Sequence, residues 1–341
     1  MDKEEEVNVA TLTRLDEYGN VKWSKQYPVA GISGFSGIVV TASGNFVCTG
    51  STQTGARGKS SIFALSTDED GNDLWEYIYD LGGIQDDFGN EITKTTQGGY
   101  IIAGSTKNTD DAIGGVKDAL LIRIDNNGDI EWTKKYGTRE GEEAISVKQT
   151  RSGGYIFAGS TTVPSTQIGG DFDYYMVKTD ADGNQLWSKI IGGENLDFAS
   201  SIIIDKLGGY VMAGYTASKG AGARDFWVVK TDTSGSLEWD QTYGGPGDDG
   251  PSEIIQTNDG GFFITGGSES FSSDGTGDMW VVKTNNSGTE EWNKVYGGES
   301  NDGGSSAREV GNGFIISGGT SSFSINNDIY VIKANSDGSY Q

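Results

Sequence analysis

The chain has 341 residues, among them 54 glycines, four prolines, one cysteine and no histidine. Its formal charge of −24 excludes nucleic acid and anionic lipid surfaces as partners, because both require a basic footprint. The lack of histidine excludes every Ser-His and Cys-His mechanism, and the single cysteine, Cys48, excludes an internal disulfide.

The amino-terminal residues predict an acidic tether followed by two strands. Residues 1–7 are dominated by charged side chains, so we expect a flexible segment. Residues 9–15 are rich in β-branched and apolar side chains, residues 16–19 form an Asp-to-Gly turn, and Trp23 lies in the strand that follows. The same turn and tryptophan return in later parts of the chain.

A glycine followed four residues later by a tryptophan occurs six times. The pairs are Gly19/Trp23, Gly71/Trp75, Gly128/Trp132, Gly183/Trp187, Gly235/Trp239 and Gly288/Trp292. Successive tryptophans lie 52 to 57 residues apart, which is typical of repeat units that must stack to bury their apolar faces. We therefore assign all six tryptophans a structural role and expect their rings to dominate the packing between units.

Residues 197–243 show one complete unit with four short segments, at 200–204, 210–214, 225–230 and 237–243. Each segment is rich in β-branched and aromatic residues and is bounded by glycine or aspartate, which predicts strands. Turns of the Asp-x-x-Gly and Gly-Gly types join them as hairpins. Each unit is therefore expected to be a four-stranded antiparallel meander.

These units predict an all-β fold, a six-bladed β-propeller of four-stranded antiparallel blades. A parallel β-solenoid is the alternative, but solenoid coils are shorter and lack two tight hairpins per unit. The third segment occurs seven times, whereas the tryptophan strand occurs six times. We therefore expect residues 8–341 to form one propeller, closed by the Trp23 strand joining the last blade, with one third-segment strand left over.

The unit resembles a repeat widespread in exported bacterial and archaeal proteins. The residues that carry the resemblance are Asp225-Phe226-Trp227-Val228-Val229-Lys230-Thr231-Asp232, Gly235, Trp239, Tyr243-Gly244-Gly245, Asp249 and Gly260-Gly261-Phe262. Its Gly-Gly strand is similar to that of kelch propellers. Its Asp-to-Gly-to-Trp spacing is similar to that of quinoprotein-like propellers, although the aspartate here lies one residue closer to the glycine.

The first six residues, Met1-Asp2-Lys3-Glu4-Glu5-Glu6, resemble the start of a mature Bacteroidota surface lipoprotein, with Met1 in place of the lipidated cysteine. This resemblance implies an extracytoplasmic location, as an outer-membrane lipoprotein facing the cell surface. The alternative is that Lys-Glu-Glu-Glu is only a solvated charged terminus. No apolar run reaches the length of a membrane-spanning helix, so any anchor is expected to be an amino-terminal lipid.

Acids recur at one position of the loops between units, where Phe35 interrupts the series. The acids are Asp87, Glu142, Asp197, Asp249 and Asp302. We expect them around the mouth of a central channel, where they could form a cation site or a polar-ligand rim. The alternative, favoured because they recur once per unit, is that each carboxylate accepts backbone N–H bonds and holds the start of the innermost strand.

No spacing of acids matches a calcium loop, so no metal or other cofactor is predicted. Calcium at Asp110-Asp111 or Asp248-Asp249 is a weak alternative. Basic residues recur at one position of the third segment and predict ion pairs at blade edges. They are Arg14, Arg123, Lys178, Lys230, Lys283 and Lys333.

Five loops vary in length and sequence, at 106–117, 161–172, 217–224, 269–277 and 321–327. Variable loops on a rigid frame are the usual place for function, so we expect the binding face there. Three aromatics near these loops, Phe172, Phe271 and Phe323, could stack on sugar rings. The alternative is that they are ordinary exposed aromatics.

Together these observations predict a noncatalytic cell-surface propeller that serves as a protein-interaction or scaffold module. It would be a subunit of an outer-membrane or secreted complex, with protein partners in the cell envelope. A carbohydrate-binding surface lipoprotein, with polysaccharide as ligand, is the alternative. A glycosidase is a further alternative, which requires two converging carboxylates about 5–10 Å apart.

Overall fold

The computed structural model describes residues 9–29, 33–53, 59–79, 81, 86–107, 117–138, 140–163, 171–272, 275–323 and 328–341. The predicted tether at residues 1–7 and the Asp110-Asp111 pair lie outside these residues. The division of the chain into a tether and a single propeller therefore stays a prediction.

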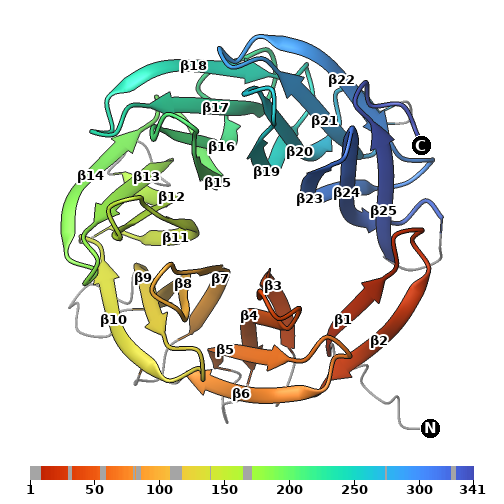
Figure 1. The fold of residues 1–341 in the computed structure, drawn as a ribbon. Helices are drawn as coiled ribbons and strands as arrows, with labels where there is room; N and C mark the ends of the chain where they lie inside the picture. Colours follow the sequence, from red (N-terminus) through yellow and green to blue (C-terminus); the bar gives the residue numbers. More distant parts are fainter. Residues whose placement is uncertain are drawn as a thin grey trace, which may run out of the picture. The chain divides into compact units, whose positions relative to one another are not determined.

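Every regular element in the described residues is a strand, and no helix occurs among them (Figure 1). The strands are β1 Ala10–Leu15, β2 Val21–Tyr27, β3 Ser33–Val40, β4 Phe46–Gln53, β5 Ser60–Thr67, β6 Asp73–Tyr79, β7 Asp87–Lys94, β8 Tyr100–Lys107, β9 Lys117–Ile124, β10 Ile130–Tyr136, β11 Glu142–Gln149, β12 Tyr155–Val163, β13 Asp171–Thr179, β14 Gln185–Ile191, β15 Asp197–Ile204, β16 Tyr210–Thr216, β17 Asp225–Thr231, β18 Leu237–Tyr243, β19 Asp249–Gln256, β20 Phe262–Ser268, β21 Asp278–Thr284, β22 Glu290–Tyr296, β23 Asp302–Val310, β24 Gly313–Thr320 and β25 Asp328–Asn335. No membrane-spanning helix is present in this part of the chain.

The chain is an all-β propeller of six blades, each on a plan of four antiparallel strands, which confirms the predicted fold class. In the five complete blades, β3–β6, β7–β10, β11–β14, β15–β18 and β19–β22, consecutive strands are hydrogen-bonded neighbours. The sixth blade has three strands, β23–β25, and the start of a fourth. Tyr340 bridges Ala334, and the Gln341 N–H donates to the Lys333 carbonyl at 2.9 Å.

The prediction that the Trp23 strand joins the last blade is wrong. Strand β2 pairs instead with β1 in a separate two-stranded sheet, from Ala10 opposite Tyr27 to Leu15 opposite Val21. Strand β1 is thus the surplus third-segment strand. A short turn joins it to β2, so this pairing carries a smaller loop-closure cost than pairing with a strand about 300 residues away.

By their contacts the residues form two compact units, Met1–Phe157 with Val177–Ser188, and Ala158–Met176 with Lys189–Gln341. The β11–β14 sheet contributes residues to both units.

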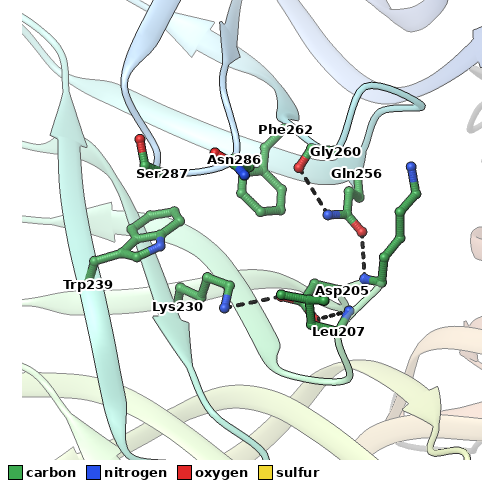
Figure 2. A pocket seen from close by; sticks show the side chains of 10 residues that line it. Asp205, Leu207, Lys230, Trp239, Gln256, Gly260, Phe262, Asn286 and Ser287 are labelled. Carbon is green, nitrogen blue, oxygen red and sulfur yellow. Dashed lines mark hydrogen bonds and ion pairs between the residues drawn. The ribbon is translucent and has the colours of Figure 1, made fainter.

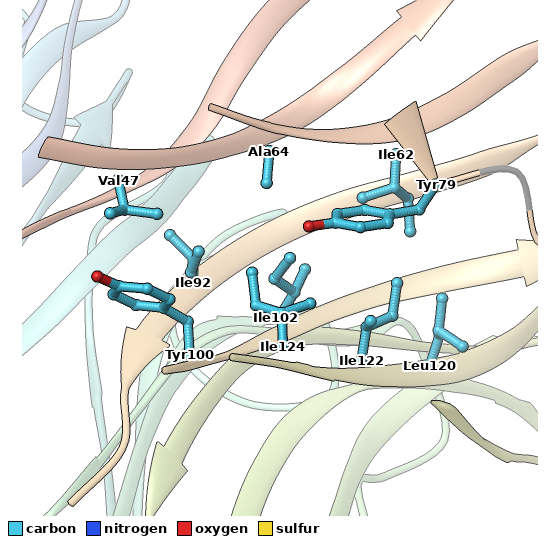
Figure 3. Packing of buried hydrophobic residues seen from close by; sticks show 10 residues of the cluster. All are labelled: Val47, Ile62, Ala64, Tyr79, Ile92, Tyr100, Ile102, Leu120, Ile122 and Ile124. Carbon is cyan, nitrogen blue, oxygen red and sulfur yellow. The ribbon is translucent and has the colours of Figure 1, made fainter. Parts of the chain in front are cut away.

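Within each unit, neighbouring sheets pack face to face. In the first unit Val47, Ile62 and Ala64 of the β3–β6 sheet meet Ile92 and Ile122 of the β7–β10 sheet (Figure 3). The sheets can do this because both faces of the third strand are apolar, as the sequence pattern predicts. Cys48 is also buried, and burial raises the pKa of its thiol to about 12, as expected of an inert apolar side chain.

The six repeated tryptophans do not dominate the packing between blades. The prediction from their spacing is therefore wrong on this point. All six are only half-buried: Trp23, Trp75, Trp132, Trp187, Trp239 and Trp292. The fully buried tryptophans of the described residues are Trp227 of β17 and Trp280 of β21, which are 2% and 1% exposed. The reason is that the third strand is covered on both faces, whereas the strand that carries the repeated tryptophan has one side in solvent.

The repeated tryptophans instead contact the Asp-x-x-Gly turn of the next sheet. Trp75 donates its indole N–H to the Asn126 carbonyl at 3.1 Å, and a methyl group on Gly128 would lie 3.0 Å from the Trp75 ring. Tyr79, at the end of the same strand, donates its hydroxyl to the Gly128 carbonyl at 2.8 Å. The same tyrosine bond occurs from Tyr27 to Gly71, Tyr136 to Gly183, Tyr243 to Gly288 and Tyr296 to Gly338.

Trp132 and Trp292 repeat this contact with a turn glycine. A methyl group on Gly183 would lie 2.8 Å from the Trp132 ring, and one on Gly338 would lie 2.7 Å from the Trp292 ring. Each indole thus covers the rim of a neighbouring turn rather than filling the space between two sheets. At Trp187 the described contact is with a cation, because the Lys178 ammonium lies 5.9 Å from the centre of its ring.

The predicted ion pairs are confirmed at Arg14, Arg123, Lys230 and Lys283. The Lys283 ammonium is buried and lies 2.8 Å from both Asp259 and Glu291. Partial burial opposes ionisation of Asp259, but hydrogen bonds from Lys283 and Thr257 outweigh it and lower the pKa of Asp259 to about 2. A carboxyl group with a lowered pKa stabilises the fold above its ordinary pKa and loses that contribution as pH falls through the folded value.

We therefore expect Lys283→Met to flatten the loss of stability between about pH 4 and pH 2, because Asp259 then titrates closer to its ordinary value. Thermal unfolding measured across this window would check it. Lys189→Met, at an exposed lysine, should leave the wild-type pH dependence unchanged. An unaltered slope in Lys283→Met would contradict the assignment.

Candidate functional site

The five predicted acids each lie at the first position of an innermost strand, β7, β11, β15, β19 or β23. All five are buried, with at most 4% of the residue exposed. They therefore do not form an exposed rim, which corrects the expectation of carboxylates around an open mouth. At Glu142, Asp197, Asp249 and Asp302 the side chain turns back onto its own loop, which places it inside the blade.

Asp249 shows what these carboxylates hold. Its Oδ2 accepts the Gly245 N–H at 2.8 Å and the Ser270 hydroxyl at 2.6 Å, and its Oδ1 accepts the Ser268 hydroxyl. Equivalent bonds join Asp197 to Gly193 and Ser218, Asp302 to Gly298 and Ser322, and Glu142 to Thr138. These contacts support the structural alternative, in which the acid fixes the loop before the innermost strand.

In the first blade, Ser33 stands where the other blades have an acid. Ser33 pairs with Thr52 as Asp197 pairs with Thr216, whereas Phe35 pairs with Gly50. The prediction that Phe35 occupies this repeat position is therefore two residues out of register. The Ser33 hydroxyl accepts the Ala10 N–H at 3.3 Å, so it takes part in holding the chain at this position.

A second series of acids, for which no role is predicted from the sequence, lies beside the first. Its members lie at or near the start of third strands and are buried: Asp118, Asp173, Asp225 and Asp278. A methyl group on Gly244 would lie 2.0 Å from Asp225 Oδ1 and 2.7 Å from Asp249 Oδ2, so two carboxylates share the space over one glycine. Burial, and with it the charge of Asp249, raises the pKa of Asp225. The recurrence of an aspartate at or near the start of these third strands was the available signal.

The three predicted aromatics do not gather in one groove. The ring of Phe271 lies 4.8 Å from that of Trp280, and the ring of Phe323 lies 5.3 Å from that of Tyr330. Phe172 meets the edge of Phe198 at 6.4 Å. Each therefore packs on an aromatic of its own or a neighbouring blade, with Phe271 and Phe323 43% and 62% exposed.

Phe271 and Phe323 are repeated covers of the third strand. Each follows the serine that bonds the innermost aspartate, and in the β15–β18 blade Lys219 takes the same place, with its ammonium 4.8 Å from the Trp227 ring. A feature that recurs in several blades serves packing first. Residues that differ between blades are therefore the better candidates for a binding site.

A pocket of about 360 Å³ in the second unit is lined by one such residue, Tyr215. It lies beside the variable loops 217–224 and 269–277, and its walls include Phe198, Tyr215, Arg224, Asp248, Asp249 and Glu269. Tyr215 is the one large side chain at its repeat position, where the other blades have Ser51, Ser105, Ser160, Gly267 and Gly319. That substitution within an otherwise small series was the sequence signal for this site.

The polar side chains of the pocket are fixed by hydrogen bonds and by stacking on aromatic rings. Arg224 donates Nε to Asp248 Oδ1 at 3.0 Å and Nη2 to Asp248 Oδ2 at 2.6 Å, and these bonds lower the pKa of Asp248. The guanidinium carbon lies 5.2 Å from the centre of the Tyr215 ring, and Tyr215 stacks on Phe198 at 5.6 Å and 10°. An aromatic pair thus supports a planar ion pair at the wall of a hollow.

A second hollow, of about 400 Å³, lies at the opposite ends of the strands β15–β22 (Figure 2). Lys230 pairs there with Asp205 at 3.1 Å, and Gln256 accepts the Lys206 N–H and donates to the Gly260 carbonyl. Trp239 and Phe262 form its apolar part. Because these polar groups satisfy one another and their residue types recur between blades, we assign this hollow to packing.

No group of three or more His, Cys, Asp or Glu side chains able to hold a metal occurs in the described ranges. Asp248 and Asp249, one of the two weak calcium alternatives, are committed to Arg224 and to Ser268, Ser270 and Gly245. That pair therefore offers no free chelating geometry to a metal.

Comparisons with known proteins bear on the fold. No protein-family model matches the chain, and no curated protein sequence matches it. A protein of unknown function from Dyadobacter fermentans is similar in structure, with a TM-score of 0.55 and 14% identity over 88% of this chain and 93% of that one. An ulvan lyase matches with a TM-score of 0.54 and 11% identity over 92% of this chain and 81% of that one. The WD40 domain of Neurospora crassa Pan2 matches with a TM-score of 0.52 and 12% identity over 99% and 91%. At these identities the likeness is one of β-propeller fold alone, and the kelch-like and lipoprotein resemblances stay predictions.

Proposed function

We propose that the protein is a noncatalytic binding module that takes a neutral saccharide in the pocket lined by Phe198, Tyr215, Arg224 and Asp248. The carrying observation is that Tyr215, the one large side chain at its repeat position, meets Arg224 and Phe198 in this pocket, next to two variable loops. A volume of about 360 Å³ suits a small ligand or the end of a chain. Such ligands are bound by aromatic surface together with a few fixed polar groups.

The chemistry of the walls favours a neutral sugar. The Arg224–Asp248 fork offers planar donors and acceptors for neighbouring hydroxyls, and Tyr215 and Phe198 offer apolar surface for a sugar ring. Asp249 and the exposed Glu269 add negative charge, which disfavours uronic acids and sulfated sugars. The ulvan lyase among the structural neighbours binds such an anionic polysaccharide, but it shares only the fold.

The same walls argue against hydrolysis. A glycosidase needs one carboxyl group with a raised pKa and a second carboxylate near it. In this pocket Asp248 has a lowered pKa because of Arg224, and both oxygens of Asp249 accept hydrogen bonds. Neither is placed as a general acid, which supports binding without catalysis.

Binding of purified protein to an array of neutral and uronic-acid oligosaccharides tests the proposal. We expect neutral glycans to bind, and Tyr215→Ser, which restores the residue of other blades, to weaken binding about tenfold or more. Phe271→Ser, at an aromatic outside the pocket, serves as the matched control and should bind like wild type. Binding that Tyr215→Ser leaves intact, or no glycan bound at all, would refute the proposal.

A second candidate is the protein-interaction module that the sequence favours, in a cell-envelope complex with a lipid-anchored amino terminus. The observation that favours it is exposed apolar surface on the sixth blade, where Phe323, Ile329 and Tyr340 are 62%, 67% and 61% exposed. Copurification of the protein from its native membranes tests it. A partner lost in a Phe323→Ser, Ile329→Ser double variant but kept in Tyr215→Ser would favour this candidate over sugar binding.

A further inference from the structure

The β1–β2 sheet of the first unit is half of a blade. Arg14 of β1 lies opposite Trp23 of β2, as Lys230 of β17 lies opposite Trp239 of β18. Strand β1 therefore matches a third strand and β2 a fourth strand. In the complete blades the third strand also pairs with a second strand, as β17 does with β16. Within the described residues β1 pairs with β2 alone, so its other edge has no neighbouring strand.

Strand β3, which follows this half-blade, has an aliphatic side chain in solvent. Ile38 of β3 is 47% exposed. At the same position of the other innermost strands the residue is at most 2% exposed, and these residues are Ile92, Val147, Ile202, Ile254 and Ala307. The position is thus buried in the five later blades and open only beside the half-blade.

Ile92 shows which contacts bury this position (Figure 3). It packs with Val47 of the second strand β4 and with Ile62 and Ala64 of the third strand β5, all from the preceding blade. Strand β3 contacts β1, which is a third-type strand. Ile38 is exposed because the β1–β2 sheet, in the part of the chain that the structure describes, contains no second strand.

In complete blades the base of the third strand pairs with an acid from the hairpin between the first and second strands. Lys230 lies 3.1 Å from Asp205, which is in the turn between β15 and β16, and it also pairs with Glu238 of the fourth strand. Lys283 has the same two kinds of partner in the next blade. The hairpin of the two inner strands thus carries a negative charge to this base.

The half-blade has an excess of positive charge at the corresponding place. Lys22, the residue before Trp23, stands where Glu238 stands in β18. Arg14 forms its ion pair with the exposed Glu69 of the next sheet, at 3.7 Å. In a chain with a formal charge of −24, this edge is suited to an acidic segment.

We propose that the open edge of β1 and the exposed face of β3 bind a β-hairpin of a partner protein, which supplies the first and second strands of this blade. Backbone hydrogen bonds to β1 would give affinity, as in other cases of strand addition. An aliphatic side chain would cover Ile38 as Val47 covers Ile92, and an acid in the hairpin turn would meet Arg14. A second copy is the poorer occupant, because its own inner hairpins are each paired with a third strand.

A fluorescent peptide of residues 197–216, which copies the β15–β16 hairpin, is a direct probe of this surface. We expect saturable binding by fluorescence anisotropy, and no binding of a scrambled peptide of the same composition. Ile38→Asp should weaken binding about tenfold or more, because it places a charge in the apolar contact. Leu186→Asp, at a leucine of the same unit that is 58% exposed, is the matched control and should bind like wild type.

Reversing the charges tests the acidic turn. The Asp205→Lys peptide should bind wild-type protein more weakly than the unchanged peptide, and it should bind Arg14→Glu protein more tightly than wild type. Equal affinity of the two peptides for wild-type protein would overturn the proposal. Should Arg14→Glu fail to fold, the comparison of the two peptides on wild-type protein decides.

Sedimentation of the protein alone distinguishes a second copy from a partner hairpin. We expect a monomer. A dimer that is lost in Ile38→Asp but kept in Leu186→Asp would place a second copy on this surface and overturn the proposal. Failure of the unchanged peptide to bind, or binding that Ile38→Asp leaves intact, would overturn it as well.

Discussion

Replacing Gly288 by alanine is expected to lower the free energy of unfolding by about 3 kcal/mol, roughly three times the loss from the same change at Gly260. Both glycines close hairpin turns of the β19–β22 blade and both have positive φ, 78° and 91°. Alanine in that region of φ costs about 1 kcal/mol at either position. The difference between them must therefore come from what the new methyl group meets.

At Gly288 a methyl group would lie 2.8 Å from Cζ3 and 2.9 Å from Cη2 of Trp239, while at Gly260 it would meet nothing within 4 Å. Trp239 belongs to the neighbouring β15–β18 blade. The added methyl group would therefore push the two blades apart. It also strains the bond from the Tyr243 hydroxyl to the Gly288 carbonyl. Overpacking of this kind adds about 1–3 kcal/mol.

Urea denaturation of the two single variants measures the difference. Gly288→Ala combined with Trp239→Leu should lose less than the sum of the single changes, because the smaller side chain leaves room for the methyl group. Equal losses at Gly260 and Gly288 would contradict the idea that the tryptophans are wedged against the turns of the next blade.

Asp249→Ala is expected to cost about 3 kcal/mol, because it leaves several buried donors without an acceptor at once. The carboxylate accepts bonds from the Gly245 N–H, the Ser268 hydroxyl and the Ser270 hydroxyl, and it is 1% exposed. Asp249→Asn keeps one acceptor oxygen and should cost less than half as much. Ser268→Ala, which removes one donor together with its bond, should cost about 1 kcal/mol.

The order Asp249→Ala, then Asp249→Asn, then Ser268→Ala is the expected ranking in thermal or urea unfolding. If Asp249→Ala unfolds like wild type, the innermost acids are not the anchors of their loops. In that case the assignment of Asp87, Glu142, Asp197 and Asp302 to the same structural role fails with it.

The sequence by itself determined the blades. Alternating apolar residues, Gly-Gly and Asp-x-x-Gly turns and evenly spaced tryptophans are local signals, and local hydrogen bonds and φ preferences make each unit a four-stranded meander. The two-sided apolar third strand also predicted face-to-face packing of sheets. The position of the anchoring acids followed from the same repetition, apart from the first blade, where Ser33, two residues before Phe35, occupies the equivalent place.

The extent to which each tryptophan side chain is buried could not be predicted from its spacing in the sequence. Trp132, Trp187 and Trp292 recur as regularly as any residue of the chain, yet they are half-buried, while Trp227 and Trp280 on the third strands are fully buried. Periodicity reports that a side chain has the same environment in each unit. The solvent exposure of that side chain depends on whether its strand lies at the edge of the sheet or is covered on both faces.

Only the tertiary structure brings the residues of the candidate binding site together. Tyr215, Arg224 and Asp248 lie on three separate segments, and their stack and ion pair depend on how two neighbouring blades pack. The pairing of Asp225 with Asp249 across Gly244 depends on the same packing, because acids 24 residues apart carry no sign in the sequence that they converge. The pairing of β2 with β1, and not with the last blade, was likewise a choice between two edges that strand propensity cannot distinguish.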